Sequence, residues 1–176
     1  MVAAKLGIII KMCKDYLTKG AKQIVHGERY KSKLTLKPLT SMNYKIEDIE
    51  GIGSVYGEKL REAGVTTTAD LLARGATRKG REELAEATGI SPALILTWTN
   101  HADLFRIHGV ASQFAELLEA SGVDTVKELR HRNAENLHER MLKMNDLRGL
   151  CDRVPSVKEL EKMIAEAANL EPVMTY

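Results

Sequence analysis

Apolar residues recur along most of this chain at intervals of three and four positions, the spacing of one face of an α-helix. The clearest stripe consists of Leu94, Ile95, Trp98, Ala102 and Phe105. Ser91 before it is typical of a helix N-cap and Pro92 of a first helical residue, so a helix is predicted to start here, with Trp98 in the core. No run alternates apolar and polar residues as a half-buried strand would, and the sequence therefore predicts an all-α fold.

Shorter stripes with capping residues predict further helices on both sides of this one. Their expected first or capping residues are Ser54, Thr66, Thr77, Thr125 and Asn133, and the last helix is expected to start in the run from Pro155 to Glu159. Thr125 with Glu128 has the spacing of a capping box. Gly64 and Gly89 are expected to end two of the helices, because glycine readily adopts the left-handed conformation found there.

Two stretches of the chain repeat one pattern. Residues 49–65 align with residues 107–123 without a gap, since each position has its counterpart 58 residues later. Both contain a glycine turn, an aromatic residue (Tyr56 or Phe114) and a terminal Gly-Val. A constant offset of this kind indicates an internal duplication.

In each stretch a tight turn is expected to precede a helix. Gly51 and Gly53 flank the apolar Ile52, so the backbone can turn sharply and leave N–H groups exposed. A helix starting at Ser54 adds its own unpaired N–H groups and the positive end of its dipole. The combination suits an anion, above all a backbone phosphate.

This pattern resembles the helix-hairpin-helix motif, which implies sequence-independent contact with a nucleic-acid backbone through the hairpin amides. DNA-binding members often carry a basic residue shortly after the second glycine, where this chain has Val55 and Gln113. In the second stretch Ala111 also replaces the second glycine. The second hairpin is therefore the weaker match.

The resemblance extends from Met42 to Tyr176, a region that looks like a small bacterial family of tandem helix-hairpin-helix proteins filed as a domain of unknown function. Residues 43–49 resemble the opening of that family and residues 172–176 its end. The family implies two tandem units packed as one compact helical domain. The expected boundaries are 1–41 for a basic N-terminal helix and linker, 42–105 for the first unit and 106–176 for the second.

Charge is divided unevenly between these parts. Of the 26 basic and 24 acidic residues, nine and two fall in residues 1–41, which gives +7 there and −5 in the remainder. The first part is interpreted as a basic arm for nucleic acid or a membrane surface, with a solvated extension as the alternative. The acidic remainder weakens a nucleic-acid function, because affinity for nucleic acid comes mainly from neutralised phosphates.

Other chemistry is sparse. No apolar run reaches the ~20 residues of a membrane span. Cys13 and Cys151 lack metal-ligand spacing and are interpreted as reduced thiols of a cytoplasmic protein. The five histidines show no helical ligand pairing. We therefore expect no enzymatic activity, no metal and no cofactor.

The leading hypothesis is a non-catalytic module that binds DNA or RNA. Phosphate contacts are expected at Gly51, Ile52, Gly53 and Ser54, and weaker ones at Gly109, Val110 and Ser112. Lys59, Arg78 and Lys79 are expected to supply the positive charge that attracts the phosphates. A protein-interaction or scaffold module is the alternative, and a small-ligand pocket between the units is the third hypothesis. The sequence leaves the oligomeric state open.

Overall fold

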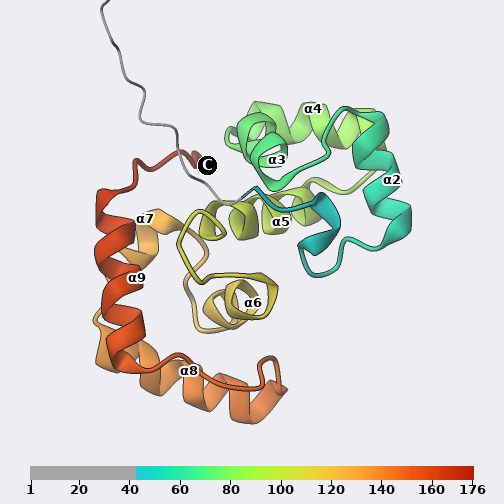
Figure 1. The fold of residues 1–176 in the computed structure, drawn as a ribbon. Coiled ribbons are helices and arrows are strands. Elements are labelled where there is room, and N and C mark those ends of the chain that lie inside the picture. Colours follow the sequence, from blue (N-terminus) through green and yellow to red (C-terminus); the bar gives the residue numbers. More distant parts are fainter. Residues whose placement is uncertain (1–42) are drawn as a thin grey trace, which may run out of the picture. The chain divides into compact units, whose positions relative to one another are not determined.

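The computed structural model describes residues 43–176, which all belong to one compact unit, Leu39–Tyr176. Over these residues the chain is helical, with eight α-helices, one 3-10 helix and no strand (Figure 1). The elements are η1 (Ile46–Asp48), α2 (Ser54–Glu62), α3 (Thr68–Gly75), α4 (Arg78–Thr88), α5 (Pro92–Leu104), α6 (Ser112–Ala120), α7 (Val126–Leu129), α8 (Ala134–Arg148) and α9 (Val157–Asn169). The all-α prediction is confirmed for this range, and the predicted arm at 1–41 lies outside the described residues.

Side chains cap most of the helices at their N-termini. The capping residues are Thr67, Thr77, Ser91, Thr125, Asn133 and Ser156, each of which accepts a backbone hydrogen bond. Only α2 and α6 among α2–α9 lack such a bond, with Gly53 and Ala111 at their N-cap positions. The prediction of Ser54 as N-cap was wrong by one residue, because the Gly53 carbonyl already accepts the first helical bond from Gly57 N at 2.9 Å.

The two stretches that repeat in the sequence also share a backbone conformation. Positive φ occurs at matching glycines: +83° at both Gly51 and Gly109, +80° at Gly64 and +79° at Gly122. The turn closes with the same bond in each, from Ile52 N to Ile49 O and from Val110 N to Ile107 O, both 3.1 Å. Non-glycine residues rarely adopt such φ values, so the glycines fix these turns.

Helix α5 is buried on several sides at once. It contacts α3 and α4 of the first repeat and α6 of the second, where the first repeat stands for residues 42–105 and the second for residues 106–176. Trp98 is only 2% exposed, as its apolar stripe predicts. The helix ends at Leu104, with Phe105 as its C-cap, and the second repeat starts at the next residue, so the repeats join without a flexible linker.

The last turn of α5 buries an ion pair. The Asp103 carboxylate is 1% exposed and accepts from Arg106 Nη1 at 2.6 Å and from Val126 N, at the start of α7, at 2.9 Å. Arg106 also donates through Nη2 to the Glu171 carbonyl at 2.9 Å. One pair thus joins α5, α7 and the segment after α9.

Replacing Asp103 with Ala should unfold the protein more easily. Arg106 would keep its buried charge without a counter-ion, a change that typically costs about 3–5 kcal/mol. Urea denaturation followed by circular dichroism measures the difference. Asp146→Ala, at an exposed position on α8, should cost less than about 0.5 kcal/mol. Equal effects of the two substitutions would contradict this account of the pair.

Glu159 should make a pH-dependent contribution at the start of α9. Hydrogen bonds from Arg153 and Ser156 lower the pKa of this carboxyl from 4.5 to about 2. A lowered pKa in the folded state stabilises it above pH 4.5, and the effect is lost as the pH falls toward 2. Glu159→Gln should therefore melt below the wild type at pH 7, with the gap closing by about pH 2. A gap that stays constant across a melting series from pH 7 to pH 2 would refute this assignment.

Candidate functional site

The first hairpin, residues 49–54, presents its backbone to solvent where the chain leads into α2 (Figure 1). Gly51, Gly53 and Ser54 are exposed, whereas Ile52 is buried and anchors the turn. A Cβ on Gly53 would meet no atom within 4 Å, so space is open in front of this residue. The hairpin is therefore accessible to a ligand.

The start of α2 has donors to offer such a ligand. The first N–H groups of a helix have no partner within it, and most helices here use a side chain to satisfy one of them. Gly53 has no side chain to do so. The N–H groups of the first turn and the helix dipole together favour an anionic oxygen at this point.

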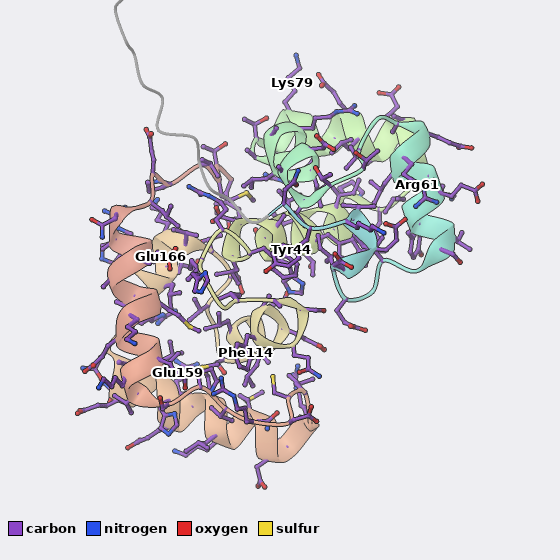
Figure 2. The ribbon with its side chains drawn as sticks, viewed as in Figure 1. Tyr44, Arg61, Lys79, Phe114, Glu159 and Glu166 are labelled. Carbon is purple, nitrogen blue, oxygen red and sulfur yellow. The ribbon has the colours of Figure 1, made fainter. Side chains whose placement is uncertain are left out.

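The second hairpin, residues 107–112, has the same turn, but glutamates of this chain accept hydrogen bonds from two of its donors. The start of α6, like that of α2, has no side-chain cap. His108 N donates to Glu166 Oε2 at 3.1 Å, and Figure 2 shows that glutamate on α9. The hydroxyl of Ser112, the first residue of α6, donates to Glu50 Oε2 at 3.4 Å. Because Glu50 immediately precedes Gly51, the first hairpin supplies a carboxylate to the second.

The predicted basic residues do not gather at the first hairpin. Arg78 and Lys79 start α4 and pair with Glu82 and Glu83, at 2.9 and 3.5 Å. Lys79 projects on the side of α3 and α4 that faces away from the loop leading into α2 (Figure 2). Lys59 lies in the last turn of α2, at the opposite end from the hairpin.

Two aromatic residues, Tyr56 and Trp98, pack beside the first hairpin. The rings of Tyr56 and Trp98 lie 5.2 Å apart, and a Cβ on Gly51 would be 3.3 Å from Trp98 Nε1. Tyr56 nevertheless stays 36% exposed, and its neighbour Val55 is 65% exposed. The hairpin is thus bordered by apolar surface where many DNA-binding hairpins have a basic side chain.

Sequence reasoning missed Glu50 and Glu166. Their contacts with the second hairpin join residues 62 and 58 positions apart. No local pattern indicates such pairings. By contrast, the pairs Arg78–Glu82 and Lys79–Glu83 have i,i+4 spacing, a signal that the sequence does contain.

Other chemistry in this part of the chain is limited. Within residues 43–176 no group of three or more His, Cys, Asp or Glu side chains could hold a metal ion. In the same range, no helix has the length and apolar character needed to cross a membrane.

Glu166→Gln should expose the second hairpin. An amide is a weaker acceptor than a carboxylate, so the His108 N–H should exchange faster with deuterium while the fold is kept. Hydrogen-exchange NMR measures this rate. Glu161→Gln, on the same helix, makes the same change at an exposed residue and should leave the rate unaltered. Unchanged exchange in Glu166→Gln would show that this carboxylate does not close the hairpin.

Comparison with known proteins gives one match. A family described as "Domain of unknown function (DUF4332)" matches residues 50–170, which is more than half of the chain. No curated protein and no solved structure matches significantly. The match contains the helices α2–α9, the second hairpin and all of the first hairpin except residue 49.

Proposed function

We propose that this chain, which belongs to the DUF4332 family, is a non-catalytic nucleic-acid-binding module made of two helix-hairpin-helix units. In this proposal the first hairpin contacts backbone phosphates through Gly51, Gly53 and Ser54, while Ile52 anchors the turn with its N–H bonded to Ile49 O. The observation that carries it is the uncapped start of α2, which lies open in front of Gly53.

The second hairpin supports this proposal from within the same chain. Its matching turn has two donors, His108 N and the Ser112 hydroxyl, and each binds a carboxylate oxygen. A phosphate oxygen has the same charge character and accepts the same bonds. The first hairpin would thus bind phosphate oxygens of another molecule, whereas the second hairpin binds carboxylate oxygens of its own chain. Gly109, Val110 and Ser112 would contribute weakly, because their surroundings are already acidic.

The charge distribution makes the expected binding weak and dependent on salt. Arg78 and Lys79 are already paired with glutamates, and Lys59 is the remaining basic residue proposed for this site. The net charge of +7 in residues 1–41 would then supply most of the attraction to the polyanion. We expect dissociation constants of about 1–100 µM at physiological salt, the usual range for binding without sequence preference.

A protein-interaction module is the second candidate, favoured by the exposed Val55 and Tyr56 beside the hairpin. Exposed aromatic and aliphatic side chains are common at the centre of protein interfaces. Val55→Lys separates the two functions. The added positive charge should strengthen binding to nucleic acid, because it attracts phosphate. It should weaken binding to an apolar protein partner, because a charge is costly to bury there.

Gly53→Asp tests the proposed site without disturbing the fold. The residue has φ −76° and ψ −177°, which any residue can adopt, and a Cβ there has free space. Aspartate is also a good N-cap, so stability should be kept or should rise by a few tenths of a kcal/mol. The aspartate carboxylate would accept hydrogen bonds from the free amides of the first turn of α2 and would repel phosphate. Affinity for a short DNA duplex should fall roughly tenfold, or about 1.4 kcal/mol.

Fluorescence anisotropy across a salt series measures this affinity in the full chain. Ala111→Asp makes the same substitution type at the equivalent position of the second hairpin, and its effect should be small because Glu50 already lies there. Wild-type affinity in Gly53→Asp would remove the first hairpin as the site. Equal losses in both variants would point to a general charge effect.

A further inference from the structure

A cavity of about 350 Å³ lies within the second repeat, at the C-terminal end of α6. Its lining residues are Ser121, His131, Arg132, Asn133, Asn136, Leu137 and Arg140. The second hairpin precedes the N-terminal end of α6, so the cavity is separate from both hairpins. Its volume falls in the usual range of small-molecule sites.

The lining of this cavity is basic. It contains two arginines and a histidine but no carboxylate. Arg132 donates to the Gly122 carbonyl, and a Cβ on Gly122 would lie 3.2 Å from Arg140 Nη2, so both guanidinium groups approach one residue. Arg140 is exposed, and its guanidinium makes no hydrogen bond or ion pair with any residue in 43–176. Like charges held close together favour an anion between them.

A buried hydroxyl also lacks a partner at this cavity. Ser121 is 1% exposed, and its Oγ makes no hydrogen bond. A buried polar group without a partner is costly, and such groups often mark a binding role. The start of α8 lies beside it, where Asn133 caps the helix by accepting from Asn136 N at 2.9 Å.

The first repeat shows which of these features are special to the second. Arg74 donates to the Ala63 carbonyl much as Arg132 donates to Gly122, so an arginine that caps this helix end is common to both repeats. Ser121, however, corresponds to Ala63 in the aligned stretches. Counted from the helix N-caps, Arg140 corresponds to the buried Leu84. The Ser121 hydroxyl and the Arg140 guanidinium therefore occur in the second repeat and have no counterpart in the first.

We infer that this cavity binds the phosphate group of a small phosphorylated molecule. Arg132 and Arg140 offer planar pairs of N–H donors, which suit phosphate oxygens. The Ser121 hydroxyl is covered in this structure, so it would donate to a third oxygen after a shift of the side chains that cover it. The apolar Leu137 side chain would pack against the remainder of the ligand. This inference does not depend on the proposed function of the first hairpin.

Two substitutions that restore the first repeat's residues test the inference. Ser121→Ala and Arg140→Leu should each weaken binding of inorganic phosphate and of ribose 5-phosphate by roughly tenfold. Without phosphate, Ser121→Ala should melt no lower than the wild type, because it removes an unsatisfied hydroxyl. Arg148→Leu, an exposed change of equal charge on α8, should leave phosphate binding unaltered. Amide chemical shifts of the full chain report both affinity and location.

Three results would overturn the inference. One is an absence of phosphate-dependent shifts around Ser121 and Arg140. Another is an equal loss of binding in Arg148→Leu, which would indicate general attraction to a basic surface. The third is a preference for a 5′-phosphorylated oligonucleotide over ribose 5-phosphate, which would assign the cavity to nucleic acid. Gly53→Asp should leave phosphate binding here unchanged, so failure of one proposal can be told from failure of the other.

Discussion

The buried pair of Asp103 and Arg106 is the interaction on which the rest of this arrangement depends. Burying a charge is expensive unless every bond it can make is satisfied. Asp103 meets this demand with Arg106 and the amide of Val126. Arg106 reaches the carbonyl of Glu171 through Nη2, whereas its buried Nε has no partner in residues 43–176. Satisfying one carboxylate therefore fixes the end of α5, the start of α7 and the path of the chain after α9.

That constraint also couples the two repeats. The chain after Glu171 continues to the first repeat, where Arg81 donates to the Thr175 carbonyl at 3.0 Å and Thr175 N donates to Ala76 O at 2.9 Å. With the repeats held in this way, Glu50 reaches the start of α6. Two copies of one turn consequently have different surroundings, since within residues 43–176 carboxylates accept from two donors of the second hairpin and from none at the matching positions of the first.

Local signals in the sequence predicted the helices well. Ser91 and Asn133 cap the helices that they were expected to cap, and Gly64 has the expected positive φ. These features depend on neighbours within four residues. The contacts that close the second hairpin, and the meeting of Ser121 with Arg140, depend on packing between distant elements, so no sequence pattern indicated them. The sequence predicted the turn at both Gly51 and Gly109. It did not predict which of the two turns has donors free to bind a ligand.

The central claim is that the first of the two matching hairpins is the main phosphate site. Amide chemical shifts of the ¹⁵N-labelled full chain, followed during titration with a short mixed-sequence DNA duplex, test it most directly. The account predicts shifts at Gly51, Gly53 and Ser54, and little change at Gly109 and Ser112. Shifts at the second hairpin, or shifts confined to residues 1–41, would contradict it.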